Sequence, residues 1–131
     1  MNDKMQYFKL EAGSGLHIIK SSAVVCGRDI NVCFGGGDTF HIGASALAVP
    51  RPSLADPAVV SASASVICVT GHKEDEAARQ AALRLASKFN TKVNVTCGLH
   101  IDNATKNDID LLYKNYLSLI DALEEKLAEY L

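Results

Sequence analysis

Three histidines that lie near glycines are the residues of this chain best suited to chemistry. His41 ends the turn GGGDTFH, and His72 and His100 each lie within two residues of a glycine. Imidazole titrates near neutral pH, binds metal ions and serves as a general acid or base. We expect a functional centre where these three histidines converge with Arg51.

Two carboxylates accompany these histidines. Asp38 lies three residues before His41, and Asp102 lies two residues after His100. Three histidines with an open position are typical of catalytic zinc. The chain has neither HxH nor HExxH spacing, so a plain surface or turn role stays open for each histidine. The pattern predicts a metal site of His41, His100 and Asp102, for a cation whose identity the sequence leaves open.

Two segments are suited to binding an anion. Arg51 stands between two prolines, which restrict its backbone and favour a bidentate contact with a phosphate. Gly71, His72 and Lys73 open an expected helix, whose free N–H groups attract negative charge. A purely structural turn is the alternative interpretation of this second segment, because any strand-to-helix turn looks similar.

Motifs for nucleophilic or nucleotide chemistry are absent from the sequence. It contains no GxSxG, no GxGxxG after a strand and no GxxxxGK[ST]. The four cysteines form no CxxC pair and lie in or beside apolar β-type runs, so we expect buried, reduced thiols. They are Cys26, Cys33, Cys68 and Cys97.

A strand, a helix and a strand are expected to position His72 and His100. Residues 66–70 form an apolar run, residues 78–89 repeat apolar side chains at helical spacing, and residues 92–97 alternate. This length is typical of a βαβ unit with parallel strands. Because parallel strands end at the same edge of a sheet, both histidines are predicted to lie on one rim.

The first half of the chain indicates antiparallel strands. Residues 6–12 and 16–25 are predicted strands joined by the turn Gly13-Ser14-Gly15, and residues 30–34 form a third strand that Gly35-Gly36-Gly37 ends. The small-residue strand 43–48 leaves room for a flat ligand. The conformation of residues 55–65 is left open.

The last segment predicts a long amphipathic helix of some 25 residues, with Thr105 and Asp108 as its N-terminal cap. Such a helix is ~37 Å long, more than a small domain needs as cover, so part of its apolar face is expected to serve a homodimer. That face comprises Ile109, Leu112, Tyr116, Leu119, Ile120, Leu123, Leu127 and Tyr130.

Composition limits the protein's class. The 131 residues are 48% hydrophobic with a formal net charge of −2, which indicates a single folded domain, 1–131, and no nucleic-acid partner. No apolar run reaches the ~18 residues of a membrane helix, so a cytoplasmic protein is expected. The predicted fold is α/β (α+β): a mixed sheet, antiparallel in its N-terminal half, with a C-terminal βαβ unit and a long final helix.

Five segments, in order, resemble one known family: GGDTFHIGA (36–44), PRPSL (50–54), SASASVI (61–67), GHKEDE (71–76) and GLHIDNAT (98–105). HIGA and GLHIDNAT are the most specific of them. The chain resembles the prenylated flavin chaperones, the small accessory subunits D of gallate-type, UbiD-like decarboxylases. The resemblance covers roughly residues 20–125.

The resemblance implies a protein that binds prenylated FMN, or FMN, and assists its delivery to or maturation in a UbiD-type decarboxylase without catalysing decarboxylation. A small His-based or metal-dependent enzyme acting on a phosphorylated or carboxylated metabolite is the alternative, and a structural partner subunit is a third. From the patterns above, the residues expected to bind the cofactor are Asp38, His41, Gly43, Arg51, Gly71, His72, Lys73 and His100.

Overall fold

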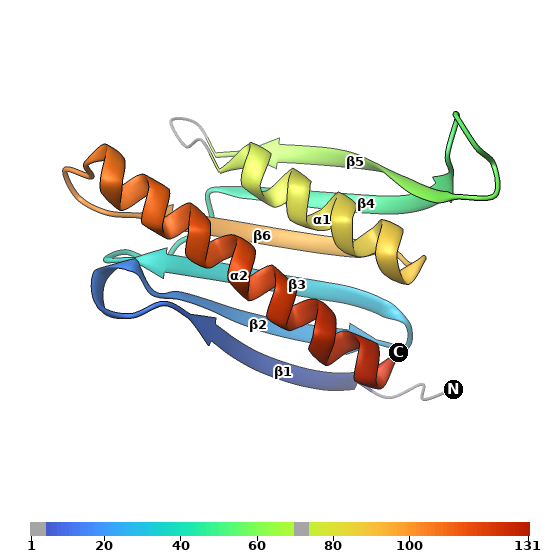
Figure 1. The fold of residues 1–131 in the computed structure, drawn as a ribbon, viewed down its shortest axis with the longest axis horizontal. Coiled ribbons are helices and arrows are strands. Elements are labelled where there is room, and N and C mark those ends of the chain that lie inside the picture. The colour runs from blue at the N-terminus through green and yellow to red at the C-terminus, as the bar shows by residue number, and fades with distance from the viewer. Residues whose placement is uncertain (1–4, 70–73) are drawn as a thin grey trace.

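Six strands form one mixed sheet that carries two helices on one of its faces (Figure 1). The computed structural model describes residues 5–69 and 74–131. The elements are β1 (Met5–Ala12), a 3-10 turn (Gly15–His17), β2 (Ile19–Cys26), β3 (Asp29–Gly37), β4 (Ala44–Pro52), β5 (Val60–Cys68), α1 (Asp75–Phe89), β6 (Val93–His100) and α2 (Lys106–Tyr130).

The strand order is β1-β2-β3-β6-β4-β5, with β3 and β6 parallel and all other neighbours antiparallel. β5 and β6 both run antiparallel to β4, so they are parallel to each other with β4 between them. The predicted mixed sheet is confirmed. The two strands of the expected βαβ unit, β5 and β6, run parallel as predicted. They are not neighbours, because β4 lies between them and is antiparallel to both.

The glycines 35–37 do not end β3, contrary to the sequence prediction, because the strand continues to Gly37. Their neighbours explain why glycine stands there. A Cβ at Gly36 would lie 2.4 Å from Cδ1 of Ile19, and a Cβ at Gly35 would lie 2.5 Å from the ring of Phe40. The strand thus leaves space for side chains that cross it. Most of residues 55–65, whose conformation the sequence left open, belongs to β5.

Alanines bring α1 close to β4. Ala44, Ala46 and Ala48 are buried, and Ala78 and Ala82 of α1 are buried as well. The small side chains of this strand therefore make room for the chain's own helix. The expectation that strand 43–48 offers this space to a flat ligand is wrong for the alanine face.

The helix α2 begins with the predicted cap: Thr105 and Asp108 form a capping box. Its apolar stripe is buried at Leu112, Leu119, Ile120, Leu123 and Leu127, and Tyr116 packs edge to face on Phe34 at 4.9 Å between ring centroids. These residues serve the chain's own core, whereas Ile109 at the start of the stripe is 57% exposed. The homodimer contact expected from the length of the helix stays a prediction.

The four cysteines are free thiols, and only Cys97 is buried. The prediction of buried thiols is wrong for Cys26, Cys33 and Cys68, which are exposed. Burial raises the pKa of the Cys97 thiol to about 12, which keeps it protonated at neutral pH.

The sheet face turned away from the helices is called the open face here. Its side chains include Ser22, Cys33, Thr96 and Ser45, which lie side by side across β2, β3, β6 and β4. Apolar side chains are also exposed, among them Leu47 and Ile67. Among the described helices, none is long and apolar enough to cross a membrane.

Candidate functional site

The candidate site lies at the sheet edge where β3 and β6 end and β4 begins. Residues 38–43 cross this edge and are fixed at both ends: the Asp38 N–H donates to the carbonyl of His100 (2.8 Å), and the Gly43 N–H donates to that of Cys97 (2.9 Å). A Cβ at Gly98 would lie 1.7 Å from the carbonyl oxygen of His41. Glycine at position 98 therefore lets the loop pass directly over β6.

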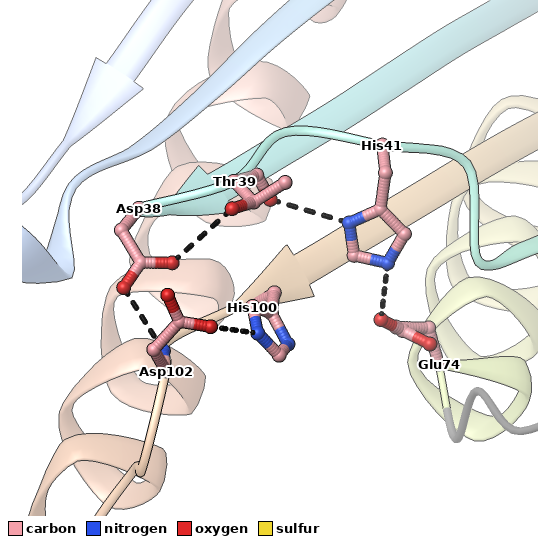
Figure 2. A network of polar contacts seen from close by, with 6 residues as sticks. All are labelled: Asp38, Thr39, His41, Glu74, His100 and Asp102. Carbon is pink, nitrogen blue, oxygen red and sulfur yellow. Dashed lines mark hydrogen bonds and ion pairs between the residues drawn. The ribbon is translucent and has the colours of Figure 1, made fainter.

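His41 connects this loop to the start of α1 (Figure 2). Its Nε2 lies 2.9 Å from Oε1 of Glu74, and its Nδ1 lies 3.2 Å from the carbonyl oxygen of Thr39. The side chains of His41 and Glu74 are 19% and 11% exposed, so water screens their contact only in part. Gly43 faces the same carboxylate, which leaves no room there for a Cβ.

His100 forms a second polar group with two carboxylates (Figure 2). Its Nε2 lies 2.8 Å from Oδ1 of Asp102, whose backbone N–H donates to Oδ2 of Asp38 (2.9 Å). One ligand atom from each of Asp38, His100 and Asp102 lies within 4.8 Å of the others, and all three residues are exposed. This donor set of one imidazole and two carboxylates suits a divalent cation.

His41 does not belong to that group, although it lies near. The rings of His41 and His100 are 6.3 Å apart between centroids and nearly perpendicular. The structure thus brings together His100 and Asp102 of the predicted metal set, adds Asp38, and directs His41 to Glu74 instead.

Arg51 lies at the other end of the sheet. It is near the C-terminal end of β4, whereas Gly43 precedes the start of that strand, and β4 pairs antiparallel to β6. Its Nε donates to Oγ of Ser63 (2.7 Å). The expectation that Arg51 converges with His41 and His100 is therefore wrong. Gly71, His72 and Lys73, the other predicted anion site, lie outside the described residues.

A pocket of about 810 Å³ lies beside the loop on the open face. Such a volume is within the range of about 300–1,000 Å³ that is common for small-molecule sites. Phe40 and Ile42 are 51% and 60% exposed, and the Phe40 ring packs over Gly35. The lining residues are Lys9, Leu10, Glu11, Lys20, Ser21, Ser22, Cys33, Phe34, Gly35, Phe40, His41 and Ile42.

Sequence reasoning missed most of this pocket. Lys9 and Lys20 are on adjacent antiparallel strands, and alternation along each strand puts them on the open face. That signal was readable once the hairpin was predicted. The contribution of Phe40 was not readable, because it depends on the loop folding back over Gly35.

The comparisons with known proteins agree with this architecture. The family model described as the prenylated flavin chaperone LpdD-like domain matches residues 13–128. The chain belongs to this family. The resemblance that the sequence motifs indicated is therefore confirmed, and the family description supports a chaperone role connected with prenylated flavin.

A solved structure shares the fold of this LpdD-like domain. The chain aligns with one in the crystal structure of a novel chaperone complex for yeast 20S proteasome assembly, at a TM-score of 0.60 and 15% identity. The alignment covers 95% of this chain and 96% of the other. Because the identity is only 15%, the likeness concerns the fold alone. The comparison with curated proteins gave no match.

Proposed function

We propose that this chain binds prenylated FMN in the pocket beside residues 38–43 and assists its delivery to, or maturation in, a UbiD-type decarboxylase. The family match supports the class of ligand, and the pocket is the observation that carries the site. In this proposal the decarboxylation chemistry belongs to the partner enzyme.

The types of residue that line the pocket are suited to binding a flavin mononucleotide. Ser22 and Cys33 supply a floor with small side chains, and the exposed ring of Phe40, which covers Gly35, supplies an aromatic surface. Aromatic rings stack on flat conjugated ligands at offset distances. We assign the tricyclic ring of the cofactor to this part of the pocket.

The phosphate requires positive charge, and Lys9 and Lys20 supply it at the same pocket. An ammonium group binds phosphate as a point charge. Glu11 also lines the pocket and lies opposite Lys20 in the strand register, which offsets part of that charge. We therefore assign the phosphate to the Lys9 side of the pocket.

Titration with FMN tests the assignment. Replacing both lysines (Lys9→Ala with Lys20→Ala) removes the charge-assisted contact of Lys9, worth about 1.5–3 kcal/mol, together with the partly offset charge of Lys20, so the dissociation constant should rise at least about tenfold. Phe40→Ala should weaken binding as well. Lys114→Ala is the matched control, because Lys114 is exposed on α2, across the sheet from the pocket.

Co-expression with a flavin prenyltransferase tests the identity of the cofactor. The purified wild-type chain should carry prenylated FMN, identified by mass spectrometry of the released ligand, and should transfer it to an apo-decarboxylase. Colourless protein without affinity for FMN or its prenylated form would overturn the proposal.

A metal-dependent enzyme is the second candidate, and the group of Asp38, His100 and Asp102 is the observation that favours it. A phosphorylated or carboxylated metabolite could bind a cation held there through its oxygens. Stoichiometric metal in untagged protein after dialysis, lost in Asp102→Asn, together with turnover of such a metabolite, would support this candidate. Metal content without turnover would instead indicate a cation that accompanies the cofactor phosphate.

A further inference from the structure

The outer edge of β5 is a long strand edge without a described partner. β5 is the last strand of the sheet, and β4 is its only strand neighbour among the described elements (Figure 1). Natural edge strands are commonly protected by charged residues or proline. Residues 60–68 contain neither, although Arg51 of β4 donates to Ser63 (2.7 Å), whereas β1 at the opposite edge carries Lys9 and Glu11.

Two hydrogen bonds show which residues of β5 present their backbone to this edge. The Ser53 N–H donates to the carbonyl of Val59 (2.8 Å), and the Val69 N–H donates to that of Gly43 (2.9 Å). In an antiparallel ladder, alternate residues direct both backbone groups to the same neighbour. Odd-numbered residues therefore face β4, and the even-numbered ones direct N–H and C=O outward. These are Val60, Ala62, Ala64, Val66 and Cys68.

The sequence of this edge is symmetric. Residues 59–67 read VVSASASVI, which is a palindrome about Ser63 apart from the exchange of valine for isoleucine at its ends. A strand that pairs antiparallel with a copy of itself places residues at equal distances from the centre opposite each other.

We propose that two copies of this chain associate by antiparallel pairing of β5 with β5, on a two-fold axis at Ser63. In this register Ala62 lies opposite Ala64 of the second copy, and Val60 lies opposite its Val66. These are the residues whose backbone groups point outward. The hydrogen-bond alternation permits this register, and the sequence symmetry about Ser63 distinguishes it from the other permitted ones.

The pairing also covers apolar surface. Val59 and Ile67, which are 52% and 76% exposed, come to lie opposite each other across the two copies. Ala64, Val66 and the α1 residue Leu83 are partly buried and pack against the core, so a second strand extends this apolar layer. Burial of apolar area contributes roughly 25 cal/mol per Å² to such an association.

Sedimentation velocity at micromolar concentration tests the association. The wild-type chain should sediment as a dimer, with twice the 14.0 kDa mass of one chain. Ala64→Pro removes an outward N–H without touching the β4 ladder, so it should sediment as a monomer, whereas Ala64→Ser should remain a dimer. A monomeric wild type overturns the proposal, as does a dimer that persists in folded Ala64→Pro.

Disulfide trapping tests the register and does not depend on the proline variant folding. In a background with Cys26→Ser, Cys33→Ser and Cys68→Ser, the change Ser63→Cys puts two thiols opposite each other on the axis, where antiparallel Cα spacing permits a disulfide. Mild oxidation should crosslink this variant. Ser61→Cys should not crosslink, because it faces Ser65 of the second copy. Equal crosslinking of both variants overturns the proposed axis.

Discussion

At the scale of single residues, the loop over β6 depends on two glycines, because a larger residue at either position would collide with its neighbours. Gly98 lies under the carbonyl oxygen of His41, and Gly43 lies against the Glu74 carboxylate. The polar contacts of His41 with Glu74 and of Asp38 with Asp102 therefore rest on close backbone packing rather than on the polar residues alone. This arrangement leads to a specific mutational prediction.

We predict that Gly98→Ala displaces residues 38–43, because the new Cβ would lie 1.7 Å from a backbone oxygen that cannot rotate away. Overpacking of this kind typically costs 1–3 kcal/mol, so the free energy of unfolding in urea should fall by about that amount. FMN binding should weaken with it. Gly35→Ala is the comparison: the nearest atoms to its Cβ belong to the Phe40 ring, which can move, so stability should fall less. Equal stability of Gly98→Ala and wild type would contradict this view of the loop.

The reactivity of the Cys33 thiol measures whether the pocket is occupied. It is exposed and lines the pocket, whereas Cys26 and Cys68 are exposed elsewhere and Cys97 is buried with a raised pKa. At an FMN concentration ten times its dissociation constant, the reaction of Cys33 with a thiol reagent should slow about tenfold. Cys68 should react at an unchanged rate. Modification followed by peptide mapping measures both, and equal rates for Cys33 with and without FMN would place the ligand elsewhere.

Part of this residue pattern was readable from the sequence. The closeness of His100 and Asp102 follows from their spacing at the end of β6, whereas Asp38 joins them because β3 pairs parallel with β6, a pairing that the sequence analysis did not predict. Arg51 was misplaced because a Pro-Arg-Pro corner reveals local stiffness and nothing about which end of the sheet it occupies. The pocket lysines were missed because exposed lysines on alternating strands are usually only solvated.

At the scale of elements, the start of α2 carries the clearest pH dependence. Hydrogen bonds from Thr105 and the nearby His17, which lies 2.8 Å away, lower the pKa of the Asp108 carboxyl below its usual value of 3.8. A carboxyl whose pKa is lower in the folded state stabilises the fold above its unfolded pKa. That contribution is lost as the pH falls through the folded value.

We predict that Asp108→Asn lowers the melting temperature at pH 7 and that the difference from wild type shrinks below about pH 4. Thermal unfolding followed by circular dichroism at pH 7, 5 and 3 measures it. Glu125→Gln serves as control, because Glu125 is an exposed carboxylate of the same helix outside the capping box. A difference that stays constant from pH 7 to pH 3 would exclude the carboxylate as its source.

The elements themselves were largely predictable, and their order in the sheet was not. Helical spacing and the Thr105 cap located α2, and helical spacing over residues 78–89 located α1, which Asn90 ends in the left-handed conformation. The insertion of β4 between β5 and β6 depends on pairing between distant segments. Local periodicity carries no information about such partners.

At the scale of the whole molecule, one layer of helices covers one face of the sheet and leaves two different surfaces free. The proposed cofactor pocket lies over β1, β2 and β3, and the symmetric edge of β5 lies at the opposite side of the sheet (Figure 1). The intervening strands β6 and β4 separate the two surfaces. Ligand binding and association should therefore be separable.

The cofactor pocket and the β5 edge share no residues. Ala64→Pro should change the sedimentation coefficient and leave the FMN dissociation constant within twofold of wild type, because none of the pocket residues lies on β5. The Lys9→Ala and Lys20→Ala pair should weaken FMN binding and leave the sedimentation coefficient unchanged. Since sites that share no residues and no contacts usually act independently, the two effects should also add when the variants are combined. Loss of FMN binding in a folded Ala64→Pro monomer would show instead that the two surfaces communicate through β4 and β6.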